Sequence, residues 1–235
     1  MVKLRRKNNR AFTLIEILIV VVIISTITGL TYPVLSMIRE KSKQAVCMSN
    51  MGQMFKCFTQ YATENNGYLP LEDNSATSDS GAQCIGEVWF KAVDRYITTD
   101  ILPENQTEIS TKEKLILIKQ DPVINTVVQD KKDNTRTIKM NTQLAQGSMC
   151  RRMIDSIRFP SKTVLLFDGR INNTTVASKY DGSYGSVAQR HSGGANILFI
   201  DGHVERVQNG DSDGTTNEGW PNGDAGHGII WDPDS

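Results

Sequence analysis

A long apolar run that contains one carboxylic acid dominates the N-terminal part of this chain. The run extends over 24 residues, from Phe12 to Leu35, and the acid is Glu16. As a helix it would measure about 36 Å, enough to cross the roughly 30 Å hydrocarbon core of a bilayer. A charged carboxylate near the centre of a membrane helix costs about 2.5–3.5 kcal/mol. We therefore expect Glu16 to be kept for a specific role.

Charge is distributed unevenly around this run. Five basic residues and no acidic residue precede it, namely Lys3, Arg5, Arg6, Lys7 and Arg10. Basic residues beside a membrane helix stay in the cytoplasm, so the N-terminus is expected inside and the rest of the chain on the far side. The remainder of the chain contains 21 of the 26 Lys and Arg residues and all 26 Asp and Glu residues, so it is slightly acidic. It has no basic stripe interleaved with aromatic residues. This composition argues against nucleic-acid binding.

Two simple explanations account for only part of the segment. A secretory signal peptide has a short apolar region followed by a cleavage site made of small residues. This run is longer, and residues 25–29 (Ser-Thr-Ile-Thr-Gly) offer no good site of the Ala-x-Ala kind. A plain membrane anchor explains the length and the basic flank but leaves Glu16 unexplained.

Residues 10–16, Arg-Ala-Phe-Thr-Leu-Ile-Glu, closely resemble the cleavage and methylation signal of type IV pilins and type II secretion pseudopilins. The resemblance implies that a prepilin peptidase in the membrane cuts between Ala11 and Phe12 on the cytoplasmic side. The same enzyme then methylates the new amine of Phe12. The family usually has glycine where this chain has Ala11, another small residue. Glu16 becomes the fifth residue of the mature chain.

This processing would give Glu16 a partner in another subunit. We expect its carboxylate to pair with the Phe12 amine of a neighbour when the helices bundle. An ion pair away from water selects one register, because any other register leaves a buried charge uncompensated. In a single subunit the acid can reach the nearby interface or take up a proton. The expected partners are therefore the peptidase, other pilin-like subunits and the inner membrane.

The helix is expected to continue beyond the membrane over residues 36–66. Apolar residues recur there at three- and four-residue spacing, which predicts a face that packs on a sheet. These residues are Met51, Met54, Phe55, Phe58, Tyr61 and Ala62. Asn65-Asn66-Gly67 is predicted to end the helix, with Gly67 in the left-handed conformation. Pro33 predicts a kink or local melting, with a tolerated membrane-helix proline as the alternative.

Further segments resemble a large bacterial group of pilin-like proteins. Cys47-x-x-Asn50 and residues 61–70 (YATENNGYLP) are similar to the start and exit of the helix in that group. His191, followed by nine residues and then Asp201-Gly202, is similar to the motif near its C-terminus. The resemblance covers both ends of the domain and leaves the middle of the chain without a recognised motif.

The order of elements predicts an α+β protein, with the long helix laid on an antiparallel sheet. Strands are expected at 135–140, 163–167, 195–200 and 203–207, with Asp201-Gly202 as a hairpin turn and a short helix over 88–96. The predicted parts are a cytoplasmic leader (1–11), a membrane and assembly helix (12–35), its extramembrane continuation (36–66), an extracytoplasmic domain (67–208) and an Asp/Gly-rich tail (209–235).

His191, Asp201 and His203 are the residues that most suggest a metal or catalytic site, because two histidines and a carboxylate can bind zinc if they converge. Asp201 has a local explanation, since Asp-Gly closes the hairpin. His191 precedes Gly193-Gly194, where its ring could bond to the turn backbone. We therefore predict structural roles, no metal or other cofactor, and no enzyme activity.

The tail suggests one possible calcium site. Asn209-x-Asp211-x-Asp213-Gly214 matches the opening of a calcium-binding loop. At its twelfth position stands Trp220 rather than the bidentate glutamate of such loops. A solvated Asp/Gly turn is therefore the preferred interpretation.

Four cysteines would lie in a compartment where disulfides persist: Cys47, Cys57, Cys84 and Cys150. On one helix, Cys47 and Cys57 would be about 15 Å apart along its axis, beyond the roughly 7 Å Cα limit for a disulfide. The pairings that remain join each of them to Cys84 or Cys150. Buried free thiols are the alternative.

Together these features predict a structural subunit of a type IV pilus-like filament or of a type II secretion pseudopilus. A membrane-anchored binding module, for example for a glycan, is the alternative that shares the same signal. A third and weaker hypothesis is an anchored hydrolase that uses His191 and Asp201. Both a major and a minor subunit fit this sequence.

Overall fold

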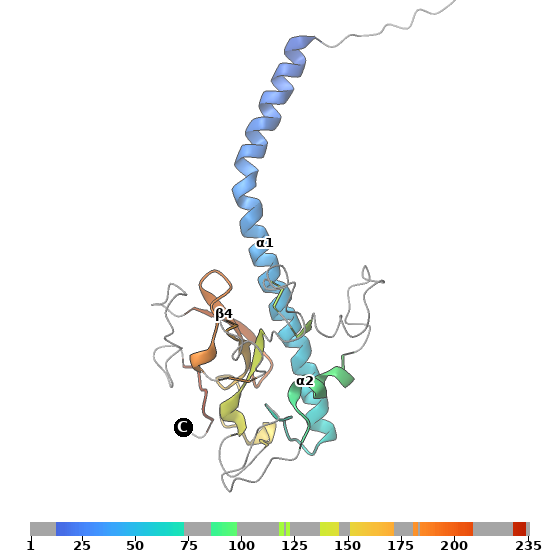
Figure 1. Cartoon of the computed structure of the whole chain (residues 1–235), viewed down its shortest axis with the longest axis vertical. Helices are drawn as coiled ribbons and strands as arrows, with labels where there is room; N and C mark the ends of the chain where they lie inside the picture. The colour runs from blue at the N-terminus through green and yellow to red at the C-terminus, as the bar shows by residue number, and fades with distance from the viewer. Residues whose placement is uncertain are drawn as a thin grey trace, which may run out of the picture. The chain divides into compact units, whose positions relative to one another are not determined.

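The computed structural model describes residues 13–72, 86–97, 118–119, 121–122, 137–145, 151–171, 181–182, 184–208 and 228–233. The chain divides into two units, Met1–Arg39 and Glu40–Ser235, and each is described by itself. Helix α1 (Leu14–Glu64) contributes to both units (Figure 1). The second unit, called the domain below, therefore includes most of the predicted extramembrane helix.

Helix α1 begins with a capping box. Thr13 precedes its first residue, and Glu16 Oε2 accepts hydrogen bonds from the Thr13 backbone N–H and from Thr13 Oγ1, both at 2.7 Å. In return, Thr13 Oγ1 accepts the backbone N–H of Glu16 at 3.4 Å. Reciprocal bonds of this kind satisfy donors that the start of a helix otherwise leaves open. Glu16 thus has a partner in its own chain before any assembly.

The first unit presents an apolar helix surface. Its large side chains from Leu14 to Ile38 are exposed, and the helix is long and apolar enough to cross a membrane. Five hydroxyl side chains within it donate to backbone carbonyls three or four residues earlier: Ser25, Thr26, Thr28, Thr31 and Ser36. Because these hydroxyls are bonded to the backbone, they add little polarity to the surface. The segment fits a membrane anchor.

Pro33 does not interrupt the helix. Helix α1 is continuous through this position, so the predicted local melting does not occur. The Pro33 carbonyl accepts a hydrogen bond from Ser36 Oγ at 2.8 Å. The kink of the helix axis at this position stays a prediction.

The predicted helix end at Asn65-Asn66-Gly67 is confirmed, and two of its residues, not one, are left-handed. Gly67 has φ of +83°, and Asn66 before it is also left-handed, at 56°. The Gly67 N–H donates to the Ala62 carbonyl at 2.7 Å. This is the long bond of a Schellman cap, which satisfies a carbonyl of the last helical turn.

The domain contains a five-stranded sheet in the order β3-β1-β2-β4-β5. The strands are β1 (Ile138–Asn141), β2 (Val164–Asp168), β3 (Asp181–Gly182), β4 (Gly194–Phe199) and β5 (Val204–Gln208). All pairs are antiparallel except β1 with β3, a short parallel pair at the edge. The predicted α+β class, the antiparallel sheet and the hairpin at Asp201-Gly202 are confirmed.

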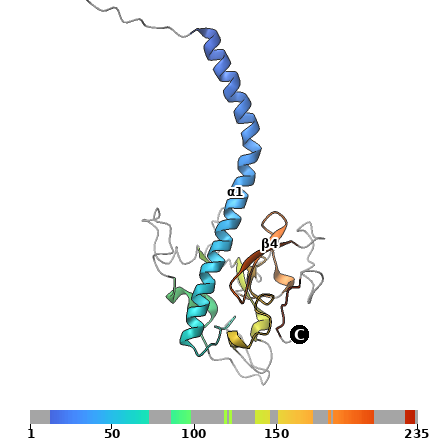
Figure 2. The same ribbon diagram turned by 180° about the vertical axis from the view of Figure 1, so that it is seen from behind.

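Both faces of this sheet are covered. Figures 1 and 2 show the C-terminal part of α1 beside the sheet from opposite sides. On the helix side, Met51, Met54 and Phe58 of α1 pack with Leu165, Leu166, Leu198 and Ile200. Leu165 and Leu166 both belong to this core because the β2–β4 register shifts between Val164 and Leu166. The apolar stripe predicted on α1 therefore packs on the sheet as expected.

The second face is covered by residues 228–233. Ile230 exchanges backbone hydrogen bonds with the start of β2: its carbonyl accepts the Val164 N–H at 3.0 Å, and its N–H donates to Lys162 at 2.8 Å. Trp231 is buried and packs edge to face on Phe167, with ring centroids 5.0 Å apart. This part of the predicted tail thus belongs to the core. The calcium-loop residues, including Asp211 and Asp213, lie outside the described residues.

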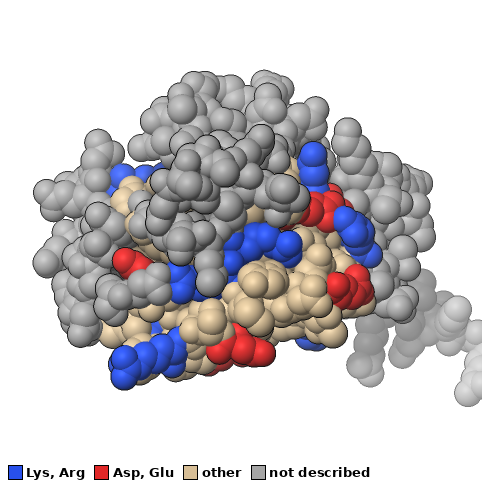
Figure 3. Space-filling model, turned by 90° about the horizontal axis from the view of Figure 1, so that it is seen from below, with Lys and Arg blue, Asp and Glu red and all other residues tan. Residues whose placement is uncertain are grey.

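The short helix predicted over 88–96 is confirmed as α2 (Trp89–Ala92) followed by the 3-10 turn η1 (Val93–Arg95). Its apolar residues enter the helix-side core, where Trp89 stacks on Phe58 at 6.1 Å between centroids. Ion pairs link Arg95 to Glu87 and the partly buried Lys119 to Asp94. On the face shown in Figure 3, basic and acidic side chains are interspersed among uncharged ones in the described part.

Gly202 provides a test of the hairpin packing. It has φ of +93°, and a Cβ there would lie 2.4 Å from Phe55 Cε1 of α1. We expect Gly202→Ala to lower the free energy of unfolding by about 2 kcal/mol, because both the backbone strain and the clash must be relieved. Thermal unfolding of the full chain in mild detergent should show a Tm lower by about 4–8 °C.

Gly185→Ala is the matched control, because no neighbouring atom lies within 4 Å of a Cβ built there. Its Tm should stay close to that of the parent chain. Equal Tm values for the two variants would contradict the packing of Gly202 on α1.

Candidate functional site

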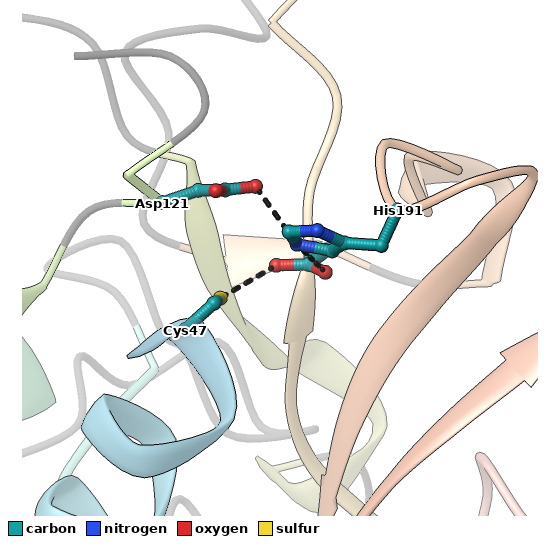
Figure 4. Close-up of side chains that lie close together, drawn as sticks. Cys47, Asp121 and His191 are labelled. Carbon is teal, nitrogen blue, oxygen red and sulfur yellow. Dashed lines mark hydrogen bonds and ion pairs between the residues drawn. The ribbon is translucent and has the colours of Figure 1, made fainter. Parts of the chain in front are cut away.

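Five polar side chains meet where α1 approaches the end of β2. They are Cys47, Asp121, Asp168, Arg190 and His191, and we call them the buried polar cluster. Cys47, Asp121 and Asp168 are fully buried, and His191 is 2% exposed. Figure 4 shows the side chains of Cys47, Asp121 and His191 converging from a helix and two separate loop segments. The cluster thus brings together segments that are far apart in the sequence.

His191 lies between two carboxylates. Its Nε2 is 3.2 Å from Asp121 Oδ2 and 3.3 Å from Asp168 Oδ2. Neither ring nitrogen has a partner with hydrogen-bond geometry among the described residues. Burial alone would lower the pKa of His191, but the two carboxylates outweigh it and raise the pKa to about 9. The ring is therefore an imidazolium at neutral pH.

Asp168 connects the sheet to the helix. Its Oδ2 accepts the backbone N–H of Asn196 on β4 at 2.8 Å, and its Oδ1 accepts the Cys47 thiol at 3.5 Å. Burial, together with the nearby charges of Asp168 and Asp121, raises the pKa of the Cys47 thiol. A protonated, fully buried thiol is a poor nucleophile, which argues against a cysteine-based catalytic site.

Arg190 supplies the second positive charge. Its Nε donates to Asp121 Oδ2 at 2.6 Å, Nη1 to the Gly169 carbonyl at 2.7 Å and Nη2 to the Thr137 carbonyl at 2.8 Å. The guanidinium thus bridges the segment at Asp121, the residue before β1 and the residue after β2. Together with the imidazolium it balances the two carboxylates, so the cluster has no net charge.

The structure separates the residues that suggested a metal or catalytic trio. His191 faces Asp121 and Asp168, whereas Asp201 pairs with His203, with 2.6 Å between Oδ1 and Nδ1. Asp201 Oδ1 also accepts the backbone N–H of His203, which supports its predicted role in the turn. The expectation that the His191 ring bonds to turn backbone is wrong. Only its main chain does so, by exchanging bonds with Gly194.

The two ends of the His-x9-Asp-Gly motif both pack against α1. His191 belongs to the same cluster as Cys47, and Gly202 lies against Phe55. The first of these contacts also reaches the residue that opens the Cys-x-x-Asn motif. The two motifs, from opposite ends of the domain, therefore form one packing unit.

Most of the buried polar cluster was not anticipated. Cys47 had been considered for a disulfide, but Cys47 and Cys57 are buried free thiols, and Cys84 and Cys150 lie outside the described residues. Asp168 directly follows the strand predicted over 163–167, a position that by itself indicates no function. Asp121 and Arg190 carried no sequence signal.

The N-terminal segment is the second candidate site. The structure describes Thr13 and Glu16, whereas Ala11 and Phe12 lie outside the described residues. Residues 6–32 match the family model described as the prokaryotic N-terminal methylation motif. The chain carries a prepilin-type N-terminus. No curated protein and no solved structure matches the chain. The match includes the predicted cleavage position and Glu16 but does not reach the domain.

Substitution of Arg190 tests whether the stability of the domain depends on the charge balance of the buried polar cluster. In chelator-containing buffer, we expect Arg190→Met to lower the free energy of unfolding by about 3–5 kcal/mol, because buried carboxylates lose their hydrogen-bonded cation. Arg190→Lys should be intermediate, since it restores the charge but not the planar fork. Urea unfolding, followed by the fluorescence of the buried Trp89 and Trp231, measures both.

The control is Arg158→Met, at an exposed position where Arg158 stacks on Phe159. It should change the free energy of unfolding by no more than about 0.5 kcal/mol. The charge-balance account fails if Arg190→Met is as stable as this control.

Proposed function

We propose that this chain is the precursor of a type IV pilin-like or pseudopilin subunit, which is cleaved, methylated and polymerised through the apolar part of α1. The observation that carries the proposal is a prepilin-type methylation motif on a helix whose apolar residues are exposed. A separate α+β domain follows, as expected for a subunit that displays a folded body outside a helical bundle.

Processing would begin while the subunit is held in the inner membrane. The basic residues before the apolar run favour an N-terminus in the cytoplasm, and the domain would lie on the other side. Prepilin peptidase would cut between Ala11 and Phe12 and methylate the Phe12 amine. Removal of the basic leader also removes the charges that hold the N-terminus at the cytoplasmic surface.

Assembly would cover the apolar surface of α1 with neighbouring helices. Side chains such as Leu18, Val22 and Ile24 are more than half exposed in the single subunit. In the membrane, lipid covers them. In a filament outside the bilayer, only other subunits can do so. The exposed surface of α1 is therefore the surface expected to form the bundle.

Glu16 would serve two purposes at this step. Both hydrogen bonds from Thr13 use Oε2, so Oε1 remains for a donor from another subunit. A carboxylate can accept several hydrogen bonds, and an ammonium is a strong donor to it. Glu16 can therefore cap its own helix and receive the Phe12 amine of a neighbour.

Two substitutions separate these purposes. Glutamine preserves a capping box, whereas alanine removes it. We expect Glu16→Gln and Glu16→Ala both to insert normally in the membrane and both to yield few or no filaments, because each lacks the charge. The measurement is the protein in the sheared filament fraction and in the membrane fraction of cells that carry the assembly machinery.

The control is Thr13→Ser, which retains the hydroxyl of the cap and should assemble like the parent chain. Normal filament yield from Glu16→Gln would show that the cap, and not the charge, is what assembly needs. That result would remove the intersubunit ion pair from the proposal.

The mature N-terminus tests processing directly. Mass spectrometry of the protein purified from its native envelope should find a chain that begins at Phe12 and carries one methyl group on its amine. A chain that begins at Met1, in cells with an active prepilin peptidase, would contradict the proposed route.

A further inference from the structure

The buried polar cluster has an arrangement that hydrogen bonding alone does not explain. His191 is buried, its ring points at two carboxylates, and both ring nitrogens are without a hydrogen-bond partner among the described residues. Cys47 Sγ, a carboxylate oxygen from each of Asp121 and Asp168, and a His191 ring nitrogen all lie within 4.8 Å of one another. We propose that these four residues bind a zinc ion that fastens α1 to the sheet.

The donor atoms suit zinc. Zinc is bound by Cys sulfur, His nitrogen and carboxylate oxygen, and structural zinc sites are four-coordinate and tetrahedral. Calcium and magnesium prefer oxygen donors alone, so the thiol and the imidazole disfavour them. All four proposed ligands are buried, which describes a closed, structural site and not one that keeps a position for a substrate.

The two distances from His191 Nε2 to the carboxylates match edges of a zinc tetrahedron. With the usual zinc bond lengths, nitrogen and oxygen ligands are roughly 3.3 Å apart, and sulfur and oxygen ligands roughly 3.5 Å. From His191 Nε2, the distances to Asp121 Oδ2 and Asp168 Oδ2 are 3.2 and 3.3 Å, as expected for two such edges. Cys47 Sγ lies 3.5 Å from Oδ1, the other oxygen of Asp168, and one donor atom from each of the four residues lies within 4.8 Å of the others. A charge-assisted hydrogen bond between nitrogen and oxygen would be shorter, about 2.7–2.9 Å.

Zinc binding preserves the charge balance of the cluster. Binding requires a neutral imidazole and a thiolate, so the ion displaces one proton from His191 and one from Cys47 to solvent. Two positive charges enter and two leave. Asp121, Asp168 and Arg190 keep their charges, and the cluster remains neutral.

Neighbouring groups hold the carboxylate ligands in place. Arg190 Nε donates to Asp121 Oδ2, and the Asn196 backbone N–H donates to Asp168 Oδ2. Partners of this kind orient the ligands of metal sites, and their loss commonly weakens metal binding by about 10–100-fold. We regard Arg190 and the Asn196 backbone as positioning groups and not as ligands.

The experiment uses the full chain, purified in detergent and freed of metal with a chelator. Titration with Co²⁺ should give the visible absorption of a tetrahedral site and a near-ultraviolet thiolate-to-cobalt band, both saturating at one ion per chain. Zn²⁺ should then displace the cobalt and abolish both signals. Zn²⁺ should also raise the Tm of the metal-free chain, because it binds the folded state.

Two cysteine variants locate the site. Cys47→Ser should abolish the thiolate band and weaken Zn²⁺ binding by at least about 100-fold, whereas Cys57→Ser, at the other buried cysteine of α1, should retain both. Asp121→Asn, which keeps the size of the side chain, should weaken binding even if Cys47→Ser does not fold.

Three results would overturn the proposal. The folded parent chain could show no cobalt spectrum, the thiolate band could persist in Cys47→Ser, or Asp121→Asn could bind Zn²⁺ as tightly as the parent. A band that persists in Cys47→Ser would assign the metal to another cysteine of the chain. None of these results bears on the cleavage and polymerisation of the N-terminal segment.

Discussion

The balance of charge around Asp168 is the interaction on which the domain depends. This carboxylate is fully buried at the end of β2, where an uncompensated charge would cost several kcal/mol. It is accepted there because Arg190 and His191 lie beside it and because the Asn196 backbone and the Cys47 thiol bond to it. These partners come from helix α1, strand β4 and the turn before that strand. The charge is therefore compensated only when these segments are packed together, so the cluster favours the native arrangement over others.

The same contacts give a physical reason for two motifs that are far apart in the sequence. Cys47 opens the first, and His191 and Gly202 mark the second. Cys47 and His191 share the buried cluster, while Gly202 lets the β4–β5 turn approach the ring of Phe55. Each contact attaches the sheet to α1, the element that also carries the apolar surface proposed to form the filament. A load applied to the domain would thus reach the helix at two points along its length.

The parts of this fold that could be predicted depend on local chemistry. The apolar run, the spacing of Met51, Met54 and Phe58, and the turn at Asp201-Gly202 act within a few residues of one another, so helix, stripe and hairpin followed from the sequence. The Thr13-x-x-Glu16 cap is equally local, and its spacing is visible in the sequence. The buried polar cluster is different, because Asp121 and Arg190 have no periodic context and meet Cys47 only through the tertiary path of the chain. Trp231 was hidden for another reason: the Asp- and Gly-rich composition around it is typical of solvated segments.

The packing of residues 228–233 sets the order in which the domain can be completed. Helix α1 is synthesised before Ile230 and Trp231, which close the far face of the sheet against β2 and Phe167. Until they arrive, β2 lacks one neighbour and Phe167 is uncovered. The far face of the sheet can therefore be closed only after both residues have been synthesised. The apolar residues of that far face, Phe167 among them, would stay exposed through that interval, when a chaperone would have its clearest opportunity to bind.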